Sequence, residues 1–407
     1  MLYVDTLTVA EAEQLIKQYR TGSSFFFSSP RKTLLTQGEF ARLTYPAASE
    51  AVTLPQRVAK LLEDAKQAGR THSIVVGAIP FHINQPSHLF IPATVESYDE
   101  LRFSSEAAPE RPQISNYEVH PVPAPKQFKQ GVNRLLELFQ QGVLQKAVLS
   151  RTLHVSLPQA LQIPQLLAHL AFYHSHGYTF AVPLIPEQSL ASNHISDPEI
   201  SARTLVGASP ELLVTKKGLQ IKANPLAGSA ARSDDPVEDE RRAAALLASV
   251  KDRYEHAIVI EAVAEALKPY CSKLDVPSEP SLVQTKAMWH LSTEINGVLK
   301  DESITSLDLA LAMHPTPAIC GTPTDLARDV IQEIEQYDRE FYTGAVGWTD
   351  ENGDGEWAVT IRCADTEGLS MKVYAGAGIV AGSSAEAELA ETSAKFRTML
   401  AAMGLKE

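Results

Sequence analysis

Strand-like and helix-like segments alternate irregularly along this 407-residue chain, and this irregularity limits the possible folds more than any other feature. Runs rich in β-branched and aromatic residues predict strands at 147–155, 178–184, 212–214, 341–348, 356–363 and 369–374. Apolar residues at helical spacing predict helices at 127–141, 158–172, 236–268, 324–335 and 384–403. Because these segments do not follow a strand–helix–strand rhythm, they argue against a Rossmann-type parallel sheet. We predict an α/β protein of the α+β type with large antiparallel sheets.

A proline-rich stretch divides the chain into two unequal parts. Residues 107–128 carry five prolines, which oppose both helices and central strands. By this criterion the stretch is a crossover or a linker. It separates a less distinctive N-terminal lobe at 1–125 from a motif-bearing part at 126–407.

The charge balance and the cysteines exclude several classes of protein. The formal net charge is −13 and no lysine- and arginine-rich block is present, which argues against nucleic acid and an anionic membrane as partners. Cys271, Cys320 and Cys363 lie far apart, so we expect neither a zinc site nor a disulfide framework. The N-terminus lacks a signal-peptide pattern, and no run reaches about 18 apolar residues. We therefore expect a cytoplasmic protein.

Two glycine-containing stretches resemble known motifs only superficially. The glycines within 374–382 have the spacing G-x-G-x-x-x-G, one residue too long for a dinucleotide fingerprint, although their backbone N–H groups could hold an anion. The acidic stretch at 350–355 resembles half of a calcium loop, but Ile361 stands where that loop needs a glutamate. We interpret this stretch as a tight turn between two strands.

Two of the predicted helices carry closely spaced carboxylates. Asp252 and Glu255 are three residues apart in the first helix, and Glu388, Glu391 and Lys395 share one face of the second. Two such sets would suit Mg²⁺, which prefers oxygen ligands. Alternatively, both sets are solvated, with an ion pair between Glu391 and Lys395. The residues alone leave both interpretations open.

A lysine and a glutamate stand in strand-like surroundings. Lys146 begins the apolar run at 147–155, and Glu211 interrupts the run Leu-Val-Gly-Ala-Ser-Pro-Glu-Leu-Leu-Val at 205–214. Burial lowers the pKa of a lysine and raises that of a carboxyl group, so such a pair is typical of a base and an acid that work near neutral pH. The alternatives are a structural Lys–Glu ion pair or two side chains that reach water from strand ends.

Ten short motifs follow one another in order between residue 132 and the C-terminus. They are KAVLSR, LVGASPELLV, NPLAGSAAR, KDRYEH, WHLST, HPTPAICGTP, YDREFYTGAVGW, EWAVTIRCA, YAGAGIV and a final E-x-x-E-x-x-x-K. Together they resemble the chorismate-utilising enzymes, a family that includes isochorismate, salicylate and anthranilate synthases. The resemblance implies a single domain over 1–407 with two stacked antiparallel sheets flanked by helices. On that view the proline-rich stretch is not a domain boundary.

The resemblance also implies roles for individual residues, with chorismate as the small-molecule substrate. Lys146 would be the general base that activates water, and Glu211 the general acid that protonates the departing hydroxyl. Mg²⁺ would be held by carboxylates, with the last two often acting through water: Glu255, Glu391, Asp252 and Glu388. Substrate would contact a further set of positions: Gly228, Ser229, His290, Ala318, Arg362, Gly376, Gly378 and Lys395.

Two alanines indicate which members of the family the chain resembles. Ala227 stands where the ammonia-using members have a lysine, so we expect water as the nucleophile and no glutaminase subunit. Ala318 resembles the isochorismate synthases more than the salicylate synthases. The resemblance therefore implies an isomerase, a hydroxymutase that makes isochorismate for 2,3-dihydroxybenzoate and a catechol siderophore of the enterobactin type. A salicylate synthase and the menaquinone-pathway isochorismate synthase are the alternatives.

The polar stretch at 192–204 is longer than expected for this family. We interpret it as a surface loop that could also cover the site. The oligomeric state stays open, and a monomer is the simplest interpretation.

Overall fold

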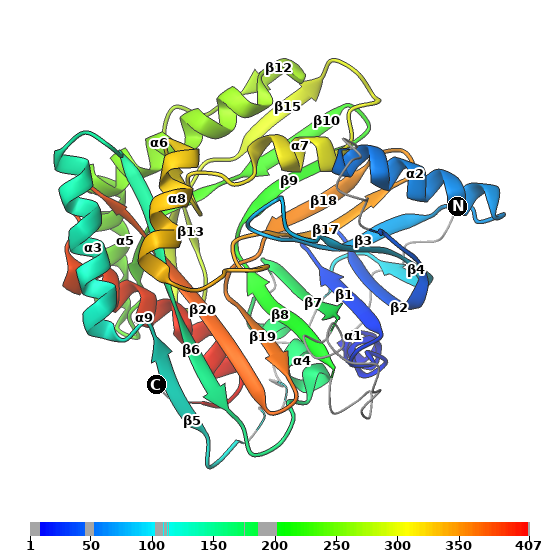
Figure 1. Cartoon of the computed structure of the whole chain (residues 1–407), viewed down its shortest axis with the longest axis horizontal. Helices are drawn as coiled ribbons and strands as arrows, with labels where there is room; N and C mark the ends of the chain where they lie inside the picture. The colour runs from blue at the N-terminus through cyan, green and yellow to red at the C-terminus, as the bar shows by residue number, and fades with distance from the viewer. Residues whose placement is uncertain are drawn as a thin grey trace.

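The strands form one long antiparallel sheet that curls into two layers (Figure 1). The computed structural model describes residues 9–44, 53–101, 109, 112, 114–174, 176–185 and 202–405, and in these ranges every strand pairing is antiparallel. The 17-stranded sheet runs through β5 (Glu118–Val122), β6 (Lys146–Ser156), β20 (Ser370–Val380), β19 (Cys363–Glu367), β8 (Arg203–Ser209), β7 (Tyr178–Leu184), β1 (Ser24–Ser28), β2 (Thr33–Arg42), β4 (His88–Tyr98), β3 (Ile74–Ile79), β17 (Ala345–Asp350), β18 (Gly355–Val359), β9 (Leu212–Lys217), β10 (Gln220–Asn224), β15 (Ile295–Leu299) and β12 (Cys271–Asp275), with β16 (Gly321–Thr322) beside the start of β6. A separate three-stranded sheet contains β11 (Leu226–Ala231), β14 (Met288–Ser292) and β13 (Ser281–Gln284).

Side-chain alternation explains why whole strands are buried. Phe25 and Phe27 of β1 lie in a cluster that also contains Val76 of β3 and Val346 of β17, so this cluster fills the space between the two layers. Phe26 points the other way, into the cluster beneath the helices. Because successive strand residues face opposite sides, a strand covered on both sides is apolar throughout. The run Ser-Phe-Phe-Phe-Ser at 24–28 is such a strand.

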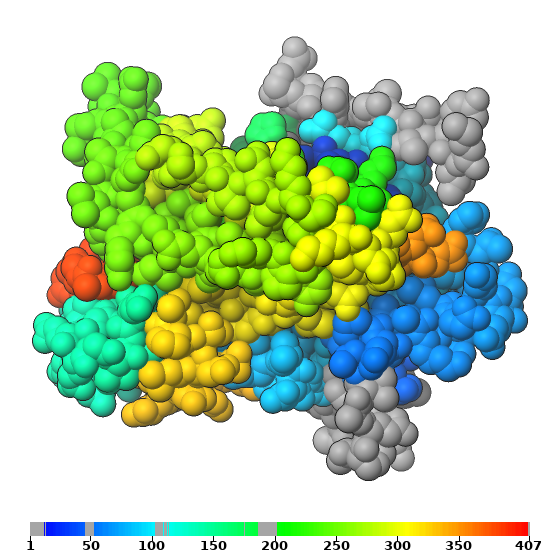
Figure 2. All heavy atoms as spheres, turned by 90° about the horizontal axis from the view of Figure 1, so that it is seen from above, coloured from blue at the N-terminus to red at the C-terminus, as the bar shows by residue number. Residues whose placement is uncertain are grey.

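Helices cover the outer faces of the layers. One group packs on the layer that contains β8 and β20: α1 (Val9–Lys17), α4 (Ile163–Tyr173) and α9 (Ala385–Ala402). A second group packs on the layer that contains β9 and β18: α2 (Leu54–Gln67), α6 (Val250–Leu267) and α7 (Ser306–Met313). The remaining helices are α3 (Pro125–Gln140) and α8 (Thr324–Glu335), beside β6, and α5 (Pro236–Ala248), beside β11 and β14. Figure 2 shows α6, in yellow-green, on the face seen from above.

The predicted fold class is confirmed: the described residues form a mixed α/β structure with a large antiparallel sheet flanked by helices. Its two layers are halves of one continuous sheet, because β7, β1, β2 and β4 link them by hydrogen bonds. The tight turn predicted at 350–355 is also present, between β17 and β18.

Two predicted elements are each divided in the structure, next to the site residues Asp252 and Arg362. The helix predicted at 236–268 is two helices, because Ser249 has a non-helical ψ of 117° and its side chain accepts a hydrogen bond from the Asp252 N–H, which starts α6 afresh. The strand predicted at 356–363 is also two strands, β18 and β19. Arg362, just before β19, has a left-handed φ of 51°, which a regular strand cannot contain.

The interpretation of 107–128 as an irregular linker is wrong over its described C-terminal part. Residues 118–122 form β5, an edge strand, where Pro121 costs no ladder hydrogen bond on the open side. Pro125 begins α3, where its missing N–H is not needed. The division of one domain at 1–407 into parts at 1–125 and 126–407 stays a prediction. The placement of β1–β4 within the common sheet supports the single domain.

Most of the polar stretch at 192–204 lies outside the described residues. Its last two residues, Arg203 and Thr204, are not loop but the start of β8, where Arg203 forms an ion pair with Asp365 of β19. Among the described helices, none is long and apolar enough to cross a membrane.

Candidate active site

One cavity brings together most of the residues that the sequence singled out. We call it the catalytic cavity. It lies where α6, α9, β6, β20 and the three-stranded sheet meet the loops after β8 and β18. Eleven predicted site residues line it: Glu211, Gly228, Ser229, Glu255, His290, Ala318, Arg362, Gly376, Gly378, Glu391 and Lys395. Lys146, Asp252 and Glu388 are not in its lining: Lys146 pairs with the lining residue Glu255, and Asp252 and Glu388 lie next to Lys251.

Glu211 is a buried carboxyl group with very few partners. It lies in the turn between β8 and β9, because Pro210 ends the first apolar run before the second begins. Its side chain accepts one long hydrogen bond, 3.4 Å from the Leu226 N–H to Oε1. Burial raises the pKa of Glu211 to about 7, against the opposing effects of Leu226, Lys146 and Arg362. A substantial fraction of Glu211 is therefore protonated at neutral pH.

Lys146 is fully buried and pairs with a different glutamate from the one expected. Its Nζ lies 2.8 Å from Oε1 of Glu255 on α6, and its charge also acts on Glu211. The base and acid candidates thus share one site, but the direct partner of Lys146 is a predicted metal ligand. Gly378 makes room for this pair, since a Cβ added there would lie 1.9 Å from Glu255 Oε1 and 3.2 Å from Lys146 Cε.

Glu391 and Lys395 form the ion pair that helical spacing suggested, at 2.6 Å, but not on a solvated face. Both side chains line the catalytic cavity. Glu391 also accepts a hydrogen bond of 3.0 Å from the Ser229 hydroxyl, and Lys395 donates one of 2.7 Å to the Gly376 carbonyl. Burial opposes ionisation of Glu391, yet Lys395 holds the pKa of this carboxyl below its usual value.

Asp252 and Glu388 stand behind the cavity, joined by a lysine that the sequence analysis missed. Lys251 lies 3.1 Å from Glu388 and 4.0 Å from Asp252. Glu388 is buried, and this burial, together with the nearby Glu391 charge, raises its pKa to about 7. Lys251 could have been singled out from the sequence, because it is the first residue of the motif KDRYEH and adjoins Asp252 at the start of α6.

The four carboxylates fit a hard divalent cation by their chemistry. Three of them are each held by an ammonium group: Glu255 by Lys146, Glu391 by Lys395 and Glu388 by Lys251. These buried carboxylates therefore need positive charge beside them. Among the described residues, no three His, Cys, Asp or Glu side chains are close enough to hold a metal ion unaided. A cation at this place would need oxygen ligands from water or substrate, as Mg²⁺ commonly does.

Arg362 and His290 lie side by side in the wall of the cavity. Both are buried, and Arg362 Nη2 lies 3.4 Å from His290 Nε2. Burial, followed by the charges of Arg362 and Lys395, holds the pKa of His290 well below its usual value, so this imidazole is neutral. Among the described residues, Arg362 has no carboxylate partner within ion-pair distance. It is therefore available to a ligand carboxylate, which guanidinium groups bind in bidentate fashion.

Gly376 and Gly378 can offer backbone N–H groups to the cavity. They lie opposite Ser150 and Val148 in the ladder between β20 and β6. The N–H groups of Ser150 and Val148 donate to acceptors outside β20. In an antiparallel ladder, the N–H groups of two opposite residues either both point toward the partner strand or both point away from it. The two glycine N–H groups therefore point away from β6. Pairing with β19 ends at Val373 and does not cover them.

A buried network that the sequence did not reveal supports one wall. Arg339 donates to the carbonyls of Val148 and Ile319, at 2.7 and 2.8 Å, and to the Thr343 hydroxyl at 3.3 Å, and all three residues line the catalytic cavity. Arg339 is held by Glu335 through two hydrogen bonds of 2.6 and 2.8 Å. Their i,i+4 spacing was visible, but it spans the end of a helix, and only the tertiary structure shows that both are buried.

Comparisons with known proteins agree with this geometry. The family described as chorismate binding enzyme matches residues 70–404. The chain is 50% identical over 407 residues to the isochorismate synthase DhbC of Bacillus subtilis (strain 168), covering 100% of this chain and 99% of that relative. It is 40% identical over 398 residues to the vibriobactin-specific isochorismate synthase of Vibrio cholerae, covering 97% and 95%. The crystal structure of DhbC from Bacillus anthracis superposes with a TM-score of 0.88 at 49% identity, covering 97% of this chain and 100% of that chain. As its ordered motifs predicted, the chain belongs to the chorismate binding enzyme family.

Proposed function

We propose that this protein is an isochorismate synthase, a hydroxymutase that converts chorismate to isochorismate. The observation that carries the proposal is that a carboxyl group with a pKa of about 7, Glu211, shares one cavity with Arg362 and with Glu255, the partner of the buried Lys146. A binding protein for a dicarboxylate would need Arg362. It would not need a poorly hydrogen-bonded glutamic acid beside a buried lysine.

The reaction needs an acid and a base on opposite sides of a ring. Water attacks C2, the double bonds shift, and the C4–oxygen bond breaks. Hydroxide is a poor leaving group, so Glu211 in its protonated form donates its proton to the departing oxygen, which leaves as water. Lys146, as the neutral amine, takes the proton of the attacking water and becomes an ammonium group. Each correctly placed acid or base contributes about 10²–10⁴-fold to the rate.

The substrate carboxylates match the cationic and N–H groups of the cavity. Arg362 is placed to bind one carboxylate, with the N–H groups of Gly376 and Gly378 nearby. Mg²⁺ would be held by Glu255 and Glu391, with Asp252 and Glu388 behind them, and when bound it would supply positive charge beside the other carboxylate. Lys146 would then lose its present ion pair with Glu255, which frees its amine to face the water.

The lining of the cavity supports water as the nucleophile. Ala227 and Ala318 both line it. Because Ala227 stands where the ammonia-using members have a lysine, no lysine enters the cavity at that position. We propose accordingly that no glutaminase subunit takes part. The relatives named for DhbC and for vibriobactin support a place in 2,3-dihydroxybenzoate and catechol siderophore synthesis. A cytoplasmic location and a monomeric state complete the proposal.

Product identification tests the proposal directly. The purified protein is incubated with chorismate and MgCl₂, and the products are separated by liquid chromatography. We expect isochorismate as the accumulating product, with no turnover after chelation by EDTA. Salicylate together with pyruvate would identify a salicylate synthase instead, and magnesium-dependent binding without any product would indicate a non-catalytic binding protein.

A further inference from the structure

A second cavity adjoins the catalytic cavity at Pro210, and we call it the outer cavity. Its lining includes Tyr173, His174, Pro210, Val283 and Lys286. We propose that the outer cavity is an encounter site for dicarboxylate anions, in which Lys286 attracts the substrate before it passes to Arg362. This inference rests on the proposed function, since the anion is taken to be the substrate of the catalytic cavity.

The two cavities share walls. Pro210 lines both, while its neighbours Ser209 and Glu211 line the outer and the catalytic cavity respectively. In the three-stranded sheet, Val283 of the outer cavity lies opposite His290 of the catalytic cavity. Pro210 is therefore the point at which the outer cavity adjoins the catalytic cavity, next to Glu211.

The charges of both cavities act on one side chain between them. Burial, together with the positive charges of Arg362 and Lys286, lowers the pKa of His174 to about 4. His174 is thus a neutral side chain in the lining of the outer cavity, within reach of both positive charges. An anion moving from Lys286 to Arg362 stays within reach of positive charge throughout.

Lys286 has an unusual environment for a surface lysine. Its Nζ lies 3.3 Å from the ring centroid of Tyr173, and no carboxylate forms an ion pair with it in the part of the chain that the structure describes. The neighbouring Arg232 is already neutralised by Asp239, at 2.7 Å. Lys286 therefore keeps its full charge for a ligand, and the ring of Tyr173 orients it.

Further outward, a third cavity shares Lys286 and adds one arginine and one acid, Arg397 and Asp234. Cations therefore outnumber acids along the approach, although the protein as a whole carries −13. A protein with this net charge repels a dianion at long range, so a local cationic path raises the association rate. Size agrees with this role, because the outer cavity has a volume of about 290 Å³ against about 60 Å³ for the catalytic cavity.

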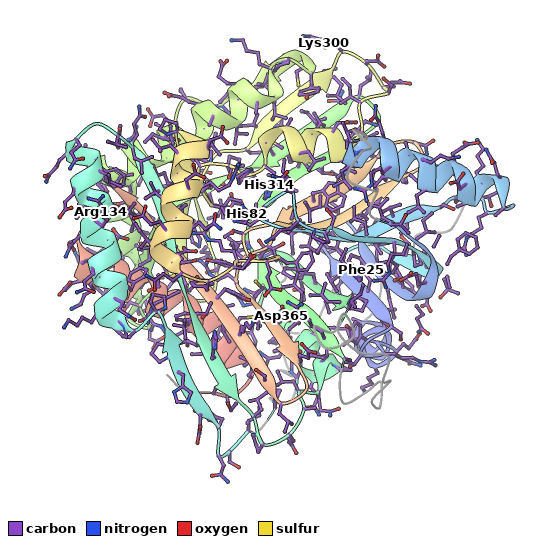
Figure 3. All side chains as sticks on the ribbon, in the orientation of Figure 1. Phe25, His82, Arg134, Lys300, His314 and Asp365 are labelled. Atoms are coloured by element: carbon purple, nitrogen blue, oxygen red, sulfur yellow. The ribbon has the colours of Figure 1, made fainter. Side chains whose placement is uncertain are left out.

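The test is charge reversal at Lys286, with a matched control at Lys300. Lys300 is an exposed lysine at the upper edge of Figure 3 that lines neither cavity. Lys286→Glu, Lys286→Gln and Lys300→Glu are compared by kcat and kcat/KM for chorismate at about 20 mM and about 500 mM NaCl. At low salt we expect kcat/KM to fall about tenfold in Lys286→Glu and less in Lys286→Gln, with kcat within about twofold of wild type. High salt should remove most of the difference.

Two outcomes would overturn the proposal. One is a low-salt kcat/KM for Lys286→Glu equal to that of Lys300→Glu, and the other is a loss that persists at high salt. Failure of the proposed function is visible separately, because the wild-type protein would then make no isochorismate. In that case the association rate of chorismate, followed by stopped-flow tryptophan fluorescence, gives the same comparison between the variants.

Discussion

Glu211 and Glu335 are equally buried, each with 3% of its surface exposed, but they differ in their partners. Glu335 receives two hydrogen bonds from Arg339 and two from Ser150, all between 2.6 and 2.8 Å. Glu211 receives one bond at 3.4 Å. The difference teaches that burial alone does not make a carboxylate reactive. The four hydrogen bonds to Glu335 give its carboxylate a structural role, whereas the single long bond to Glu211 leaves that carboxyl group able to hold a proton.

The two regions also depend on each other. The Glu335–Arg339 pair holds Val148, Ile319 and Thr343, which are parts of the wall around the catalytic cavity. A well-satisfied network thus stabilises the surroundings of a poorly satisfied acid. The following experiments test this comparison, in order of decreasing free-energy effect.

The largest effect should follow loss of the acid. Glu211→Gln keeps the shape of the side chain but cannot donate a carboxylic proton to the leaving hydroxyl. We expect kcat for isochorismate formation to fall about 10²–10⁴-fold, with chorismate binding by calorimetry nearly unchanged. Glu302→Gln, at an exposed glutamate, is the control. Turnover within about threefold of wild type would remove Glu211 from the catalytic role.

The second effect should be on stability, in the other region. Arg339→Met leaves the Glu335 carboxylate buried without its main partner, so we expect a loss of about 3–5 kcal/mol in the free energy of urea unfolding. Arg134→Met, at an exposed arginine of α3 seen in Figure 3, should change it by less than about 1 kcal/mol. If Arg339→Met unfolds like the control, the Glu335–Arg339 pair is not what stabilises the wall.

The third effect concerns the pH dependence of stability at Glu211. Its folded pKa of about 7 lies above the ordinary glutamate value of 4.5, so its contribution is favourable at low pH and is lost as the pH rises through about 7. Replacement by glutamine removes that loss. Relative to wild type, Glu211→Gln should therefore gain about 2 kcal/mol in unfolding free energy between about pH 5.5 and about pH 8. A constant difference between the two proteins over this range would contradict the elevated pKa.

The smallest effect should be on metal dependence. Glu391→Gln removes one proposed oxygen ligand while keeping a group that can bond to Ser229. We expect the MgCl₂ concentration for half-maximal activity to rise about tenfold or more. The control is Glu386→Gln, an exposed glutamate in the first turn of the same helix whose partner is Lys129. An unchanged magnesium requirement in Glu391→Gln would exclude it as a ligand.

Local patterns predicted many elements well. The helix predicted at 324–335 and the strand predicted at 178–184 have the bounds of α8 and β7. Helical periodicity marks the one buried face of α8, and a continuous apolar run marks β7, which is buried on both faces. The divisions at Ser249 and Arg362 were missed. Each depends on a single residue whose backbone conformation is set by a cap or by the cavity, and such positions leave little trace in periodicity.

The sequence by itself determined the family, the apolar strands of a large antiparallel sheet, and the residue types that the chemistry needs, because motif spacing and side-chain alternation are local properties. Only the tertiary structure decided which charges meet. It paired Lys146 with Glu255 and not with Glu211, joined Lys251 to Glu388, and satisfied Glu335 with Arg339 and Ser150. Electrostatic interactions depend on distances between segments that are far apart in the chain and on how much water remains around them, and neither quantity exists until the layers close.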